Sequence, residues 1–262
     1  MFKKLSIDFI YQICIFCQFE DIYNLMKTCK SLNQIIPKEW TYYSFSVFKS
    51  SYKKNTSYYG KKIMSYDKFD NISLNKCKFI KYFSINFLHF SETLKSTKNS
   101  IILSNRLERL TDIDILYVRD IENIYIESHK NLKEINIQSC SDLKNVILHD
   151  NMNKLELINI SNSPIQSLSI KSTLINLKTL VLVGTNITEV YIPKECTNLG
   201  FINVSGSAIK KIIYDRTSDN SEKSLILCYY MKNGKIDIYK HVHHPITIIP
   251  NEDNVNFYFL PN

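Results

Sequence analysis

Cys14 and Cys17 are the first residues in this sequence whose type and spacing suit chemistry. Two thiols three positions apart can exchange a disulfide or contribute to a metal site. Here they lie one helical turn apart among apolar residues, and no second cysteine pair stands at ligand spacing. We therefore favour packing in an apolar core over a redox or metal function for this pair.

A second chemical candidate is the cluster His241, His243 and His244, with Cys228 as a distant fourth metal ligand. The histidines precede Pro245, and a solvated loop is the interpretation that we favour. The sequence contains no glycine-rich phosphate loop, no nucleophile elbow and no paired catalytic carboxylates, and its five glycines are scattered. We expect a protein that is not an enzyme and that holds no cofactor and no metal.

Lysine pairs at 53–54 and 61–62 stand beside Tyr52, Tyr58 and Tyr59. Lysines can contact phosphates and aromatic rings can stack on bases, so this segment could bind nucleic acid. However, residues 41–100 contain 11 lysines, 3 acidic residues and no arginine, the residue favoured for reading bases. We favour a solvated lysine face over a nucleic-acid interface.

The whole composition indicates a folded protein of one or two domains, with 262 residues, 44% of them hydrophobic, and a net charge of +8. Residues 1–100 carry a net charge of +9 and residues 101–262 a net charge of −1, which favours two regions. Seven widely spaced cysteines indicate reduced thiols. No segment reaches the roughly 18 uninterrupted apolar residues of a membrane span. We expect an intracellular protein without a membrane partner, in the cytoplasm or nucleus, of a host cell if the chain is viral.

The elements that position these residues differ between the two regions. Near the N-terminus, apolar residues at three- and four-residue steps predict amphipathic helices over 7–16, 20–28 and 30–36. Beyond residue 105, a longer repeat begins. Its leading residues are Leu110, Leu132, Leu155, Leu177 and Leu199, at steps of 22, 23, 22 and 22.

Each leading leucine is followed by alternating aliphatic residues such as Ile135-x-Ile137, which predict a strand with both side chains turned inward. One such coil cannot bury its apolar face, so the coils must stack into a solenoid. Eight residues after each leading leucine, the chain has Val118, Cys140, Ser163, Thr185 and Ser207. Four of these five can donate a hydrogen bond to backbone carbonyls of the turn, which predicts a polar ladder inside the coils.

This pattern resembles the leucine-rich repeat family, L-x-x-L-x-L-x-x-N/C-x-L, over residues 110–214. It departs from the family in a second strand-like segment, for example Leu143, Val146 and Leu148, where many relatives place a helix. We expect an extended outer side and weaker curvature than in helix-backed relatives. Ile80-x-x-Phe83-x-Ile85 is interpreted as a degenerate first strand, and residues 224–262 as a strand-rich cap.

Residues 5–40 resemble the F-box, a helical module that docks on a Skp1-like adaptor of SCF-type ubiquitin ligases. Asp21-Ile22 stands at the D-L of the family, Thr28-Cys29-Lys30 at V-C-K and Trp40 at the closing tryptophan, with departures at Ser6, Cys17, Phe19 and Thr28. The resemblance implies an adaptor-binding set of Leu5, Ile10, Ile13, Ile22, Leu25, Leu32 and Trp40. A helical cap on the solenoid is the alternative, since it would also turn apolar residues inward.

Together these features predict an α+β fold in four parts. They are an F-box-like helical module at 1–40, a basic connector and solenoid entry at 41–104, leucine-rich repeats at 105–215 and a C-terminal cap at 216–262. The order matches F-box/leucine-rich repeat proteins, which implies a non-enzymatic receptor that joins a Skp1-like adaptor and cullin ligase to a target protein. The alternative is a repeat scaffold unconnected to ubiquitin.

The surface for the target protein is predicted from the residues that alternate outward on the first strand of each coil. Early coils expose Asp112, Asp114 and Glu134, whereas later coils expose apolar side chains. The predicted target-binding set is Leu157, Val181, Val183 and Phe201. Apolar clusters rimmed by polar residues often mark interaction sites. The alternative site is the second strand, with Tyr125, Ile147 and Tyr191.

Overall fold

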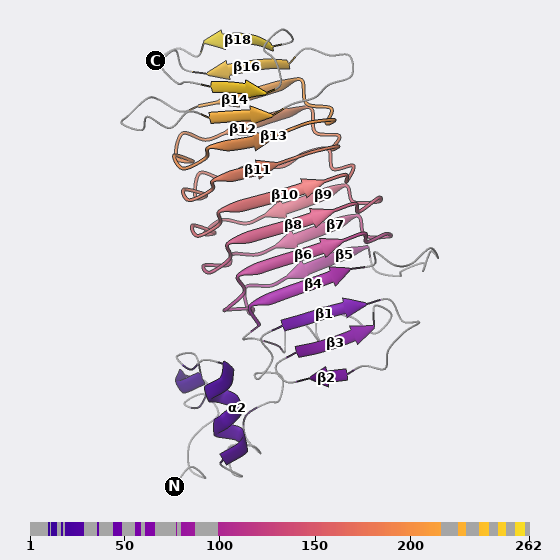
Figure 1. Ribbon diagram of the computed structural model, residues 1–262, viewed down its shortest axis with the longest axis vertical. Coiled ribbons are helices and arrows are strands. Elements are labelled where there is room, and N and C mark those ends of the chain that lie inside the picture. The colour runs from indigo at the N-terminus through magenta and orange to yellow at the C-terminus, as the bar shows by residue number, and fades with distance from the viewer. Residues whose placement is uncertain are drawn as a thin grey trace.

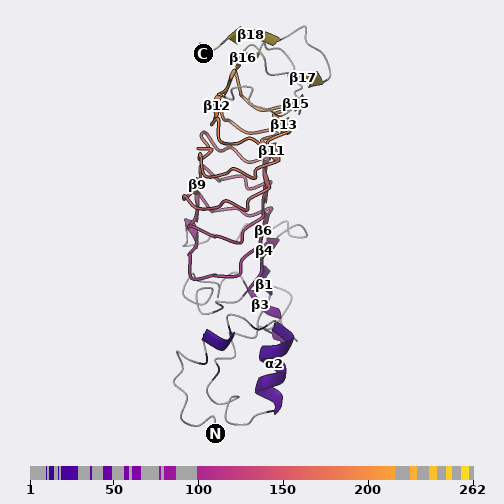
Figure 2. The same ribbon diagram turned by 90° about the vertical axis from the view of Figure 1, so that its left-hand side faces the viewer.

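A computed structural model shows the chain as a β-solenoid of about 6 turns (Figure 1). The structure describes residues 10, 12–14, 17, 19–28, 36, 44–48, 56–58, 61–65, 77, 80–86, 99–215, 225–228, 236–240, 246–249 and 255–259. The strands form two opposite walls, which Figure 2 shows edge-on, and the stack rises with little curvature in both views.

One wall is a single sheet of 11 strands, here called the front sheet. Its strands are β1 (Ser44–Phe48), β2 (Thr56–Tyr58), β3 (Lys61–Ser65), β4 (Tyr82–Asn86), β6 (Asp112–Leu116), β8 (Glu134–Gln138), β10 (Leu157–Ser161), β11 (Thr179–Val181), β13 (Phe201–Asn203), β15 (Leu225–Cys228) and β17 (Ile246–Ile249). They lie in the order β17-β15-β13-β11-β10-β8-β6-β4-β1-β3-β2. Every pair is parallel except β2 with β3, as expected when one coil follows another in the same direction.

The opposite wall consists of two shorter parallel sheets, here called the back sheets. The 3-stranded sheet contains β5 (Ser100–Leu103), β7 (Asn123–Ile126) and β9 (Asn145–Leu148). The 4-stranded sheet contains β12 (Glu189–Ile192), β14 (Lys211–Tyr214), β16 (Ile236–Lys240) and β18 (Val255–Phe259). The predicted extended outer side is thus confirmed, because strands form this wall.

The core lies between the two walls and follows the predicted repeat. The five leading leucines from Leu110 to Leu199 are at most 1% exposed. Ile135 and Ile137 of β8 pair with Ile158 and Ile160 of β10, and all four side chains are fully buried. Full burial of such a side chain contributes about 1.5–3 kcal/mol, so the repeated column accounts for most of the driving force for folding. The register read from the sequence is confirmed.

Elements at both ends of the repeat extend the walls. Phe83 and Ile85 of β4 are buried, which confirms the predicted degenerate strand, although it is not the first strand of the sheet. β1 and β3 continue the front sheet beyond β4, in a segment where the sequence pattern is weak. The strand-rich C-terminal part contributes β15 and β17 to the front sheet and β16 and β18 to the back, so it forms further turns of the same solenoid.

The predicted ladder at the eighth position is confirmed in the turns. The hydroxyl of Ser163 donates to the Ser161 carbonyl at 3.1 Å, that of Thr185 to the Leu182 carbonyl at 3.0 Å and that of Ser207 to the Val204 carbonyl at 2.6 Å. The Cys140 thiol contacts the Ile115 carbonyl at 3.7 Å. These bonds satisfy backbone groups that reversal of the chain would otherwise leave unpaired in the core. Consistent with its burial, the pKa of Cys140 is raised to about 11.

The N-terminal part contains α2 (Phe19–Thr28), where the sequence predicts a helix over 20–28. Residues 10 and 12–14 are also helical, within the helix predicted over 7–16. The helix predicted over 30–36 lies outside the described residues apart from Ile36, which is buried.

Candidate functional site

The outward face of the front sheet carries side chains in rows, because parallel pairing places equivalent residues of successive coils side by side. One row runs through Asp112, Glu134, Leu157, Thr179 and Phe201. The row therefore changes from acidic on β6 and β8 to apolar on β10 and β13. The register thus shows the change from acidic to apolar outward side chains that the sequence predicts along the stack.

The predicted target-binding residues lie on neighbouring coils but not in one row. Leu157 and Phe201 flank Thr179 in the first row, and Val181 stands in the next row between Asn159 and Asn203. Val183 lies two residues after the end of β11. All four predicted side chains are half-buried. The surface is thus an apolar cluster divided by one hydroxyl and two amide side chains.

Ile226 of β15 extends this cluster and was missed by sequence reasoning. It pairs with Phe201 in the backbone register, and its side chain is 37% exposed. The segment before β15 departs from the 22-residue spacing, so its register could not be read from the repeat. The run of three aliphatic residues Leu225-Ile226-Leu227 was the available signal for a strand, but it does not alternate and could not show which side chain faces outward. With it, the apolar cluster spans β10, β11, β13 and β15.

A chain of side-chain amides lies beside the cluster in the second row. Asn159 donates to Asn136 Oδ1 at 3.0 Å, and Asn136 donates to Asp114 Oδ1 at 2.8 Å. Asp114 ends the chain as its acceptor. Burial raises the pKa of Asp114, while the hydrogen bond from Asn136 lowers it. This row fixes the polar side chains of three adjacent strands and gives the face a rigid polar border.

The alternative residues on the back wall are also at the surface. Tyr125 and Ile147 stand next to each other on β7 and β9, with Ile147 39% exposed. Tyr191 on β12 is 46% exposed, and its hydroxyl donates to Asp215 at 2.6 Å, which raises the pKa of Tyr191 to about 12. They belong to different back sheets, so they do not form one surface of paired strands.

The predicted adaptor-binding residues divide by exposure. Ile13 is 39% exposed and Leu25 half-buried, whereas Ile10 and Ile22 are at most 3% exposed within this chain. Leu5, Leu32 and Trp40 lie outside the described residues. Cys14 is buried, and burial together with the neighbouring Cys17 raises the pKa of Cys14 to about 11, which opposes thiolate chemistry.

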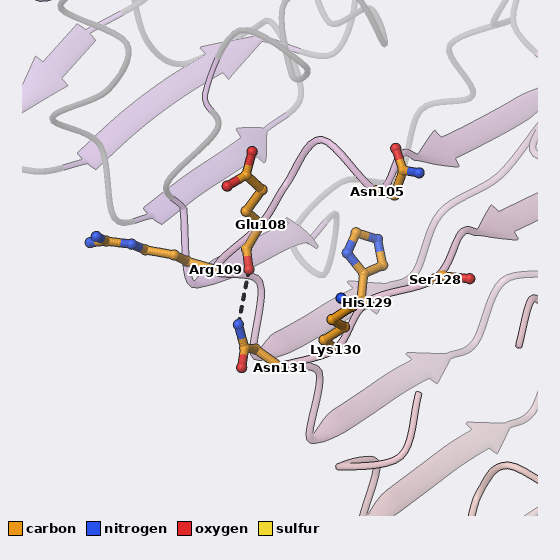
Figure 3. A pocket seen from close by; sticks show the side chains of 7 residues that line it. All are labelled: Asn105, Glu108, Arg109, Ser128, His129, Lys130 and Asn131. Carbon is orange, nitrogen blue, oxygen red and sulfur yellow. Dashed lines mark hydrogen bonds between the residues drawn. The ribbon is translucent and has the colours of Figure 1, made fainter. Parts of the chain in front are cut away.

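A recess of about 610 Å³ lies at the turns of the first two repeats and is lined by Asn105, Glu108, Arg109, Ser128, His129, Lys130 and Asn131 (Figure 3). Several of its polar groups form hydrogen bonds within the turns. The His129 ring nitrogen Nε2 lies 3.2 Å from the Leu103 carbonyl, and the Asn131 amide donates to the Glu108 carbonyl at 3.0 Å. Burial lowers the pKa of His129. The arrangement is that of structural turns with their hydrogen bonds satisfied.

Asn131 belongs to a second ladder that sequence reasoning missed. Asn176 donates to the Asn153 carbonyl at 2.6 Å, and Asn198 donates to the Ile175 carbonyl at 2.9 Å. Each asparagine directly precedes a leading leucine and reaches the preceding coil. The repeated Asn-Leu pair was the signal in the sequence.

Within the described part of the chain, no three His, Cys, Asp or Glu side chains are placed to hold a metal ion. The histidines at 241, 243 and 244 lie outside that part. No helix among the described residues is both long enough and apolar enough to cross a membrane. In comparisons with known proteins, no family model, curated protein or solved structure matches the chain.

Proposed function

We propose that this chain is a non-enzymatic substrate-recognition subunit of an SCF-type ubiquitin ligase. The F-box-like residues near the N-terminus dock on a Skp1-like adaptor, and the front sheet holds the protein to be ubiquitylated. The ligase partners carry out catalysis, since the receptor binds the target protein and the adaptor and thereby holds the two together.

The observation that carries this proposal is the outward apolar cluster of Leu157, Val181, Val183, Phe201 and Ile226 on a regular solenoid. Side chains on stacked parallel strands have fixed spacing, so the cluster presents a preorganised surface to a partner protein. The N-terminal landmarks supply the second half of the proposal. Among the described members of the predicted adaptor-binding set, Ile13 and Leu25 are accessible.

The test is the inventory of proteins retained by the tagged full chain from a eukaryotic lysate, measured by mass spectrometry. The parent should retain a Skp1-like adaptor and a cullin. Ile13→Asp should remove both, because an exposed apolar contact becomes a charge at the interface. Gln12→Asp is the matched control, since Gln12 is an exposed neighbour. Equal adaptor retention by the parent and the Ile13→Asp variant contradicts this mode of docking.

Two observations favour the second candidate, a protein-binding scaffold unconnected to ubiquitin. Ile10, Cys14 and Ile22 are buried within the chain, as a cap on the solenoid requires. Arg109 in a turn of the first repeat also donates to the backbone carbonyl of Cys14. The same inventory separates the candidates, because the scaffold retains other proteins but neither adaptor nor cullin.

A further inference from the structure

The back wall is interrupted at one coil, while the front sheet continues past it. The 3-stranded sheet ends at β9, and the 4-stranded sheet begins at β12 (Figure 1). The coil between them places residues 167–170 where a strand is expected. Among described residues, this segment forms a single bridge, between Asn145 and Ser167. We call residues 167–170 the back-sheet break.

The sequence of this coil accounts for the interruption. Ser167 and Ser169 occupy the outward positions that Asn123 and Tyr125 hold in β7, and serine has a weaker preference for strands than tyrosine. Pro164 lies just before the segment. In the coil that follows the break, Pro193 occupies the position that Asp215 occupies one coil later. Asp215 donates its backbone N–H to the Ile192 carbonyl at 3.0 Å. Proline has no N–H, so Pro193 cannot donate the equivalent bond to the break.

The inward side chains of the break are slightly more exposed than those of the back strands on either side. Leu168 and Ile170 are 8% and 5% exposed, compared with 4% for both Val146 and Leu148 in β9 and with 1% and 0% for Val190 and Ile192 in β12. The buried hydroxyl of Thr173, in the turn that follows, has no hydrogen-bond partner. This coil therefore combines greater exposure of its inward side chains with one unsatisfied hydroxyl.

The front sheet directly opposite is continuous. β10 pairs with β11 over three residues, from Leu157 with Thr179 to Asn159 with Val181. This ladder fixes the distance between β10 and β11. The coils on either side of the break can therefore separate at the back by rotating about the front sheet. Opening of the back then makes the front face more concave, and closing makes it straighter.

We propose that the back-sheet break is a hinge that sets the curvature of the front face at β10 and β11. The outward side chains of Leu157 and Val181 lie on the two strands that rotate. Opening draws them toward each other, so the hinge adapts this part of the apolar cluster to the shape of a bound protein. The proposal concerns the repeat alone and does not depend on an adaptor.

The first test is hydrogen exchange of the full chain. Backbone amides of residues 168–170 should exchange at least about tenfold faster than those of residues 146–148 in β9, since local opening governs exchange. Equal protection of the two segments would overturn the proposal, because the break would then be as closed as a regular strand.

The second test restores the missing strand. A variant with Ser167→Val, Ser169→Val and Pro193→Val gains strand-forming side chains and one N–H donor. Its amides at 168–170 should slow by about tenfold, and its longest dimension in small-angle X-ray scattering should increase as the front face straightens. Asn123→Val with Tyr125→Val is the matched control in β7 and should change neither. A slower exchange without a longer particle overturns the link between the break and curvature.

Discussion

The guanidinium of Arg109 donates a hydrogen bond from Nη2 to the backbone carbonyl of Cys14, which lies 95 residues earlier in the chain. The same carbonyl accepts the N–H of Cys17 at 3.3 Å, so it marks the end of the short helical segment at 12–14. One side chain thus joins the N-terminal part to a turn of the first repeat. Burial lowers the pKa of Arg109, as expected for a cation held between two elements.

Arg109→Met should loosen the N-terminal part without unfolding the repeats. The variant keeps the length of the side chain but loses a charged donor, a change that costs about 1–2 kcal/mol of local stability. Hydrogen exchange at residues 12–17 measures the effect directly. Arg106→Met is the control, because Arg106 is exposed in the same turn. Unchanged exchange in the Arg109 variant would show that the contact contributes nothing to docking of this part.

The core column permits a sharper test of the repeat register. Leu180→Asp should unfold the solenoid. Leu180 is 0% exposed, so the carboxylate of the introduced aspartate would be buried without a partner. The penalty is several kcal/mol against a typical stability of about 5–15 kcal/mol. Thr179→Asp, one residue earlier and facing outward, should melt within a few degrees of the parent. Circular dichroism measures the melting. If the Leu180 variant and the parent melt at similar temperatures, the register is wrong.

The success of the sequence pattern at Leu180 has a simple physical origin. In a solenoid each coil contacts only its neighbours, so the inward positions recur at a fixed interval and local alternation already states the fold. β6, β8, β10, β11 and β13 are all predicted by this rule. The same rule fails at β1 and β3, where the alternation is weak, and their pairing with β4 emerges only from the complete stack.

The candidate surfaces were predictable to a smaller degree. Alternation placed Leu157 and Phe201 on one face, but the intervening Thr179 is visible only from the register. The contact of Arg109 with Cys14 joins residues with no shared periodicity, so no local pattern could indicate it. The interrupted back wall depends on Pro193 acting on the preceding coil, which requires knowing which coils are neighbours.

The half-buried carboxyl of Asp114, at the end of the amide row, predicts a dependence of stability on pH. Because burial raises the pKa of Asp114, the folded state binds its proton more tightly than the unfolded state does. Ionisation of Asp114 therefore lowers stability as the pH rises through this raised pKa. Asp114→Asn should increase the free energy of unfolding at pH 7, by less than about 1 kcal/mol since the side chain is partly exposed, and have little effect near pH 4.

Urea denaturation at both pH values measures this difference. Asp150→Asn removes the same charge from an exposed turn and is the control. If Asp114→Asn is less stable than the parent at pH 7, the charge of Asp114 stabilises the row of hydrogen bonds by more than its burial destabilises the fold.

The apolar cluster on the front sheet leads to the last prediction. Val181 and Phe201 lie on adjacent strands and are half-buried with outward side chains, so glutamate at both positions can remain hydrated. Val181→Glu with Phe201→Glu should keep the thermal midpoint and the adaptor of the parent. It should lose other captured proteins, because two charges placed in an apolar interface cost several kcal/mol of binding. Thr188→Glu with Thr197→Glu, at two exposed neutral positions, adds the same charge and is the control. An unchanged list of captured proteins places the binding surface elsewhere, and Tyr125, Ile147 and Tyr191 on the back wall become the next positions to change.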